Sequence, residues 1–186
     1  VPAPLALPRE HNDTRFMVDS AINYIGQQKD NWLVHLSLLR PHPPWIAPEP
    51  YNAMYSPEKL QNFERQPDIK TEAKQHPFLN YYLHLPYHFV TNDDKKTARL
   101  KASYFGLMTE VDDNLGRLFE FLKKTGQWND TLIIFTSDHG EQMGDHWLLG
   151  KMGYFDASYQ IPLIIRDPDR RADKNRDKQI DAFSEN

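Results

Sequence analysis

Two charged side chains stand next to each other where a buried strand is predicted to end. Asp138 and His139 follow the uncharged run 131–136 after one serine, Ser137, and Gly140 comes after them. A carboxylate and an imidazole in succession are suitable ligands for a divalent cation, and a glycine lets the backbone pass closely around such a site. The same residue types also form ordinary turns, in which the aspartate bonds to the backbone. The pattern alone is compatible with a metal site and with a plain turn.

Two further side chains could act together with this pair. Lys151 offers a fixed positive charge for an anionic substrate. His42 lies just beyond the predicted strand 31–39, and the prolines on either side of it would present its ring rigidly. A histidine that is merely exposed in a proline-rich turn is the alternative interpretation.

The other histidines carry weaker expectations. His146 is compatible with a ligand, with a residue behind a ligand or with a loop residue, and His35 sits mid-strand, where a structural role is expected. His76, His84 and His88 are scattered in a long loop and receive no role.

The elements that must position these side chains alternate between helix and strand. Apolar residues at helical spacing predict helices over 13–28 and 96–124. Uninterrupted apolar runs predict strands that are covered on both faces, over 31–39, 131–136 and 161–166. We therefore expect an α/β fold in which the strands form one largely parallel sheet, with functional groups beyond their carboxyl ends.

One long segment does not follow this alternation. Residues 46–95 are rich in Pro, Tyr, His and Asn and are predicted to be an irregular insertion. Segments of this length are either surface decoration or carry function.

The composition narrows the class of protein. The chain has 186 residues, a size that suits one domain, and a net charge of −4, which argues against a general nucleic-acid binder. No apolar run is long enough for a membrane helix, and the first residues lack the pattern of a signal peptide. There is no cysteine, which excludes disulfides and thiolate chemistry within this chain. We expect a soluble protein of the cytoplasm or periplasm.

Several motifs, in order along the chain, resemble those of the sulfatase family of the alkaline phosphatase superfamily. The resemblance is to the branch that contains phosphonate monoester hydrolases and arylsulfatases. The motifs are Pro41-His42-Pro43-Pro44 with Pro48 and Tyr51, the helical 111–116, Gly126 with 129–131, Ser137-Asp138-His139-Gly140, Gly144-Asp145-His146 with Gly150-Lys151, and 160–165.

The resemblance implies a fold and a set of roles. The fold would be a mostly parallel sheet flanked by helices. Asp138 and His139 would be ligands of one divalent metal ion, Ca, Mn or Mg. Lys151 would contact the sulfuryl or phosphoryl oxygens of a small anionic ester, and His42 would lie near its leaving-group oxygen. Oligomerisation is left open.

The chain also departs from the family pattern. The family's nucleophile, a formylglycine made in a Cys/Ser-x-Pro-x-Arg motif, has no counterpart here, and neither do its N-terminal metal carboxylates. Residues 1–186 are therefore predicted to be part of a catalytic domain, without the nucleophile segment and the C-terminal region, and to be inactive alone. Sulfate, phosphate and phosphonate esters are equally compatible with the pattern.

Two other classes of function stay open at this point. One is a non-catalytic module of the same fold that binds an anion or a partner. The other is a phosphodiesterase or transferase of the superfamily that uses a Ser or Thr nucleophile and two metals.

Overall fold

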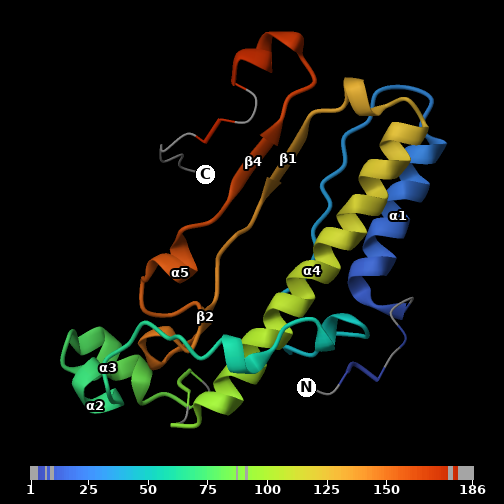
Figure 1. Ribbon diagram of the computed structural model, residues 1–186. Helices are drawn as coiled ribbons and strands as arrows, with labels where there is room; N and C mark the ends of the chain where they lie inside the picture. The colour runs from blue at the N-terminus through green and yellow to red at the C-terminus, as the bar shows by residue number, and fades with distance from the viewer. Residues whose placement is uncertain are drawn as a thin grey trace.

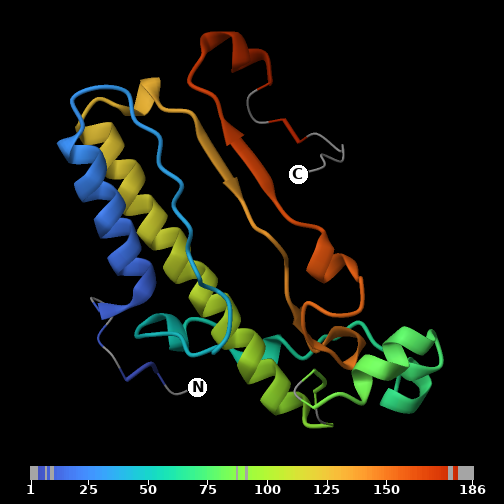
Figure 2. The same ribbon diagram turned by 180° about the vertical axis from the view of Figure 1, so that it is seen from behind.

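The computed structural model describes residues 4–6, 8, 11–86, 88–90, 92–175 and 178–179. Figure 1 shows a pair of long helices, α1 and α4, on one side and a two-stranded ribbon, β1 and β4, on the other. The short helices α2 and α3 and the strand β2 lie at one end of this arrangement. The same layout is seen from behind in Figure 2.

The helix α4, Asp94–Lys124, is the longest element and extends over about 46 Å at 1.5 Å per residue. Asp93 caps its first turn by accepting a hydrogen bond from the Lys96 amide. Lysines in the last turn suit the negative end of the helix dipole, and Gly126 follows with a φ of 76°, as expected for a helix stop. The helix predicted from the apolar stripe is confirmed.

The helix α1, Asp13–Gln27, packs along α4 and confirms the other predicted helix. Val18, Ala21 and Ile25 form its buried face. Polar contacts tie the two helices together as well, because the Asn12 amide donates to the Glu110 carboxyl at 2.9 Å.

The strands β1, Ile133–Thr136, and β4, Leu163–Arg166, pair with each other in antiparallel register. Ile133 faces Arg166 and Thr136 faces Leu163. The prediction of parallel pairing between these segments is wrong. Parallel pairing needs a crossover that returns the chain to the start of the first strand. Residues 137–162 instead stay at the carboxyl end of β1, and their one α-helix is the four-residue α5, Asp156–Tyr159.

The predicted strand over 31–39 is extended but carries no strand hydrogen bonds to any described residue. Its side chains alternate between exposed and half-buried, and Leu33 is 91% exposed. A strand is stabilised by the neighbour with which it exchanges hydrogen bonds, and no described segment takes that place. The mixed helix-and-sheet character is confirmed, with two antiparallel pairs among the described residues.

The segment 46–95 is more regular than expected. It contains the 3-10 turns η2, Tyr51–Ala53, and η3, Pro57–Lys59, and the helices α2, Ile69–Ala73, and α3, Pro77–Leu83. Asp68 caps α2, and the ring of His76 caps α3 ahead of Pro77 at its first position. These are ordinary helix start signals. Leu79, Leu83, Val90, Trp147 and Leu148 form the buried cluster behind them. That the segment is an insertion stays a prediction.

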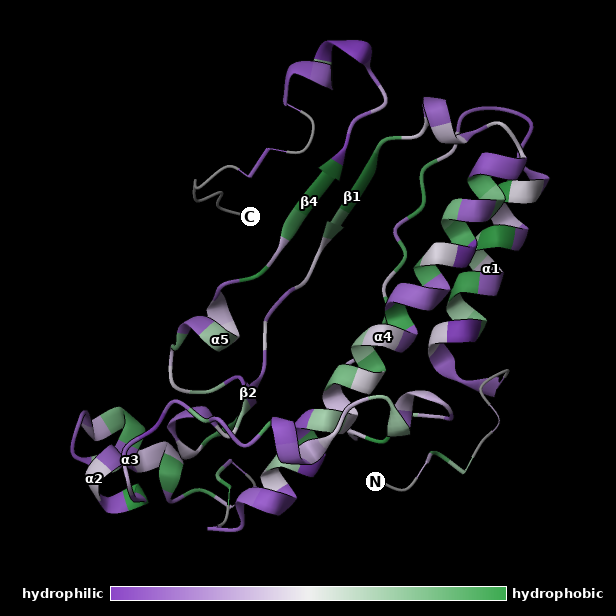
Figure 3. Cartoon of the chain, in the orientation of Figure 1, coloured by the Kyte–Doolittle hydropathy of each residue, from purple (hydrophilic) through white to green (hydrophobic). Residues whose placement is uncertain are grey.

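Hydropathy distributes unevenly over these elements. Figure 3 shows β1 and β4 as largely hydrophobic arrows, while α4 alternates between hydrophilic and hydrophobic residues. Within the described ranges, none of the helices combines the length and the apolar character needed to cross a bilayer.

Candidate active site

The segment 137–140 leaves the carboxyl end of β1 in a tight turn. The Ser137 hydroxyl donates to the carbonyl of His139 at 2.6 Å, and the His139 amide donates to the Asp138 carboxylate at 3.1 Å. These bonds would also be made in an ordinary turn. The Asp138 side chain nevertheless stays 89% exposed, so its second oxygen remains accessible to a ligand.

One ring nitrogen of His139 contacts a backbone carbonyl, and the other faces charged side chains. Its Nδ1 lies 2.7 Å from the carbonyl oxygen of Gly140, which can only accept, so Nδ1 carries the proton. Its Nε2 therefore holds a lone pair, 2.9 Å from the Lys151 ammonium and 3.8 Å from Asp138 Oδ2. A ring fixed through Nδ1–H to a backbone carbonyl is the usual arrangement of a metal-binding histidine.

Gly140 is required by a close approach between two segments. A Cβ at this position would lie 2.0 Å from the carbonyl oxygen of Ala157. Its amide donates to the carbonyl of Ser158 at 2.8 Å. The turn that carries Asp138 and His139 is thus packed directly on α5.

A short hairpin brings Lys151 to the turn. The strand β2, Gln142–Met143, pairs with β3, Leu149–Gly150, so that Gln142 faces Gly150. This pairing places Lys151 beside the residues that precede β2. Lys151 and His139 meet for that reason, although twelve positions separate them in the sequence.

The ring of His42 reaches the same place from a third segment. Its centroid lies 6.4 Å from that of His139, edge to face. His42 Nδ1 is 2.9 Å from the Pro43 carbonyl, and its own carbonyl accepts from the Arg40 guanidinium at 3.2 Å. Arg40 also donates to Pro44 at 3.0 Å, so this side chain fastens the loop in addition to the prolines.

Sequence reasoning missed Glu141 and Tyr104. Burial raises the pKa of the Glu141 carboxyl, and electrostatic interactions with His139, His42 and Lys151 act in the opposite direction. Burial, with the Glu141 charge, raises the pKa of the Tyr104 hydroxyl. Glu141 was visible as the acidic residue directly after Gly140. Tyr104 gave no signal, because its position on α4 is far away in the sequence.

The remaining histidines lie in other surroundings. His146 Nδ1 is 2.9 Å from the fully buried carboxylate of Glu72, and its ring stacks on Phe155 at 3.6 Å. His76 caps α3, and His84 Nδ1 is 2.7 Å from the carbonyl of Asn80.

The described residues fit part of a metal site. Asp138 and His139 offer a carboxylate oxygen and an imidazole nitrogen, a donor set that suits a hard or borderline divalent cation. In the part of the chain that the structure describes, no three His, Asp or Glu side chains converge as a metal-binding group. These two residues would hold a metal only together with further ligands.

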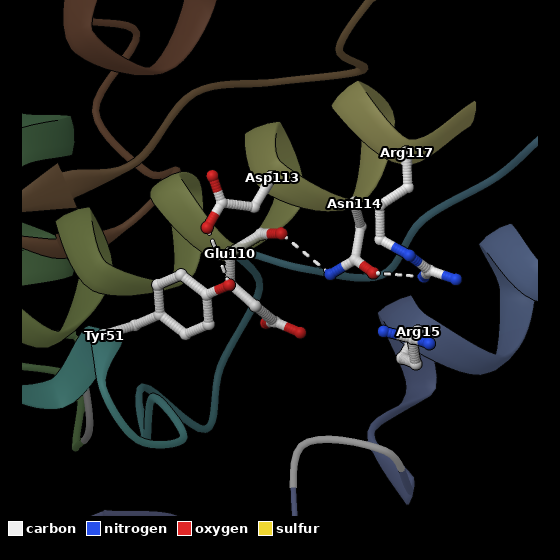
Figure 4. A pocket seen from close by; sticks show the side chains of 6 residues that line it. All are labelled: Arg15, Tyr51, Glu110, Asp113, Asn114 and Arg117. Atoms are coloured by element: carbon white, nitrogen blue, oxygen red, sulfur yellow. Dashed lines mark hydrogen bonds between the residues drawn. The ribbon is translucent and has the colours of Figure 1, made fainter. Parts of the chain in front are cut away.

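A separate polar cavity lies between α1, η2 and α4. It has a volume of about 260 Å³ and is lined by Arg15, Tyr51, Glu110, Asp113, Asn114 and Arg117. Figure 4 shows the Tyr51 hydroxyl bonded to Asp113, the Asn114 amide to the Glu110 carbonyl, and Arg117 to Asn114. Most of its polar groups therefore bind one another.

Comparisons with known proteins identify relatives of this chain. The sequence model of the sulfatase family matches residues 4–184. The multifunctional alkaline phosphatase superfamily protein PehA of Trinickia caryophylli is 45% identical over 175 residues, covering 88% of this chain and 34% of that protein. An arylsulfatase of Clostridium perfringens is 26% identical over 192 residues, covering 100% of this chain and 38% of its own length.

Solved structures resemble the fold as well. The phosphonate monoester hydrolase of Agrobacterium radiobacter superposes with a TM-score of 0.83 at 42% identity, covering 89% of this chain and 35% of that one. The phosphonate monoester hydrolase from Silicibacter pomeroyi gives 0.78 at 41% identity, covering 90% and 37%. The chain thus spans about a third of the length of these relatives. Because the family match extends over nearly all of its residues, the chain belongs to the sulfatase family, within the alkaline phosphatase superfamily.

Proposed function

We propose that the intact protein hydrolyses a sulfuric, phosphoric or phosphonic ester with the help of one divalent metal ion. One observation carries the proposal: His42, His139 and Lys151 come from three separate segments and meet at the end of β1. A plain turn at 137–140 would not require a lysine and a second histidine beside it. The relatives named as an arylsulfatase and as phosphonate monoester hydrolases support the same reaction class.

Each residue has a distinct task in this proposal. Asp138 and His139 hold the metal, which would stabilise negative charge on the transferred group when bound. Lys151 binds the non-leaving oxygens and neutralises the charge that develops there. His42, in its protonated form, gives a proton to the leaving oxygen. The nucleophile, expected to be a formylglycine, and the remaining metal ligands would lie in another part of the intact protein.

Metal content and activity, measured together, test these roles. In the intact protein, Asp138→Ala and His139→Ala should lower both, because each removes a metal ligand. Lys151→Ala should keep the metal but lose about 2–4 kcal/mol of transition-state stabilisation, since it removes one preorganised charge. Lys124→Ala, at the far end of α4, is the matched control and should change neither quantity. If Asp138→Ala kept its full metal content and full activity, residues 137–140 would be an ordinary turn without a metal site, and the proposal would be refuted.

The role of His42 is tested with a series of esters that differ in the basicity of the leaving group. General acid help matters most when the leaving oxygen is basic. His42→Ala should therefore lower kcat/KM more for alkyl leaving groups than for nitrophenyl leaving groups. An equal loss across the series would leave His42 with a structural role only.

A further inference from the structure

Arg40 connects the loop 41–45, which carries His42, with the first turn of α1. We propose that Arg40 is a positioning residue for His42: its guanidinium fixes the backbone of the loop so that the imidazole stays beside His139. The inference rests on the proposed function, because it assigns a support to the residue that gives a proton to the leaving oxygen.

The place of the His42 ring depends on the backbone that carries it. His42 is exposed, so packing against other side chains contributes little to holding the ring. Its Nδ1 lies 2.9 Å from the carbonyl oxygen of Pro43, which belongs to the same loop and moves with it. The contact with His139 is edge to face, with 6.4 Å between the ring centroids, and such a contact is weak. A shift of the loop would therefore shift the ring.

The Arg40 guanidinium binds the loop at two places and α1 at a third. Its Nη1 donates to the carbonyl oxygens of His42 at 3.2 Å and of Pro44 at 3.0 Å. Its Nε donates to the carboxylate of Asp13 in α1 at 3.3 Å. The Arg40 side chain is only 11% exposed, so water competes little for these hydrogen bonds. A planar guanidinium can hold several acceptors at once, whereas a lysine ammonium is a single point charge on a flexible stem.

The other side of the loop is anchored independently on α4. The hydroxyl of Ser103, which is 1% exposed, donates to the carbonyl of Trp45 at 2.7 Å. The same hydroxyl accepts from the amide of Ala47 at 3.2 Å. Loss of the Arg40 side chain would leave this anchor in place and release the part of the loop that carries His42. Arg40→Ala should therefore displace His42 while the rest of the site keeps its structure.

The probes are phenyl and p-nitrophenyl esters of methylphosphonic, phosphoric and sulfuric acid, and the acid hydrolysed fastest is used. In the intact protein, Arg40→Ala should lower kcat for the phenyl ester about tenfold at unchanged KM, because proton donation stabilises only the transition state. The p-nitrophenyl ester, whose leaving oxygen is less basic, should change less than about twofold. Arg40→Ala combined with His42→Ala should lose no more than His42→Ala alone, since a residue that acts through another adds nothing once that residue is gone.

Two more variants serve as control and as backup. Arg117 binds Asp19 across the same pair of helices, so Arg117→Ala removes a comparable link between them. It should leave the ratio of the phenyl to the p-nitrophenyl rate unchanged. Arg40→Lys keeps the charge but cannot hold all three acceptors, so its kcat for the phenyl ester should lie between those of Arg40→Ala and the unmodified protein. This variant carries the test if Arg40→Ala does not fold.

The outcomes separate this inference from the proposed function. Additive losses in the combined variant, or an equal loss on both esters in Arg40→Ala, would overturn the positioning role and leave the proposed function standing. An equal loss on both esters in His42→Ala would remove the task of His42 and this inference with it. Failure of the unmodified protein on the esters of all three acids would overturn the proposed function itself.

Discussion

Glu110 is a buried carboxyl whose charge state affects stability. It lies at the interface of α1 and α4, is 1% exposed, and lines the polar cavity of Figure 4. Burial, and then the negative charge of Asp13, raise the pKa of Glu110 to about 7. The unfolded chain loses this proton near pH 4.5. Between these values the folded state binds more protons, so the free energy of unfolding falls as pH rises.

Glu110→Gln should remove this decrease of the free energy of unfolding with rising pH. Its side-chain carbonyl can still accept from Asn12, while no charge has to be buried. The variant should gain roughly 1–3 kcal/mol over the unmodified protein between pH 5 and pH 7 and keep that gain above pH 7. Denaturant unfolding at several pH values measures it. Asp112→Asn, exposed on the same helix, should retain the original pH profile. A parallel profile for Glu110→Gln and the unmodified protein would contradict the pKa assignment.

At the scale of residues, the sequence predicted candidate site residues where polar or charged side chains follow the end of a predicted strand. Asp138, His139, Lys151 and His42 were selected on that ground, and the structure brings them together. Glu141 escaped notice because its burial depends on packing between distant segments. The metal-binding and catalytic roles themselves stay predictions.

At the scale of elements, α4 offers a matched pair of glycines. A Cβ at Gly106 would lie 2.4 Å from the carbonyl oxygen of Tyr51 in η2, whereas a Cβ at Gly116 would meet nothing within 4 Å. Gly106→Ala should therefore lower the free energy of unfolding by roughly 1–3 kcal/mol through overpacking. Gly116→Ala should raise it by about 0.5–1 kcal/mol, because alanine favours the helix. Equal effects at both positions would mean that η2 does not pack against α4 as described.

Both long helices could be predicted from their periodicity, because an apolar stripe records a helix's own buried face. Strand pairing could not, since it depends on a neighbour that a single apolar run does not identify. The composition of the run 163–166 is compatible with parallel and with antiparallel pairing. The direction is decided by the path of residues 137–162 between the two strands. For 31–39 the pattern indicated an extended segment correctly but could not name its partner.

At the scale of the whole molecule, the ribbon of β1 and β4 is apolar and exposed on both faces. Ile134 and Phe135 are consecutive, so they point to opposite faces, and both are exposed. Ile165, the partner of Ile134 in the ladder, is exposed as well. Unpaired edges and apolar faces of this kind associate unless other polypeptide covers them.

Residues 1–186 produced alone should therefore self-associate and bind a hydrophobic dye, and the intact protein should do neither. Light scattering after size exclusion measures the first property. Ile134→Lys combined with Ile165→Lys should reduce association, because it places charge on one face of the ribbon. Tyr24→Lys, at an exposed position of α1, is the control and should not reduce association. A monomeric chain 1–186 without dye binding would argue against this account of the ribbon.

The pairing of α1 with α4 also sets an order of events during synthesis. Asn12 meets Glu110 and Asp19 meets Arg117 across 98 positions of sequence in each case. At the usual speed of translation, α1 leaves the ribosome roughly 5 to 20 seconds before the partners that cover it. An isolated helix of 15 residues is only marginally stable in water. Its apolar face, with Val18 and Ile25, thus spends those seconds open to chaperones, and α1 acquires its final shape only once α4 has emerged.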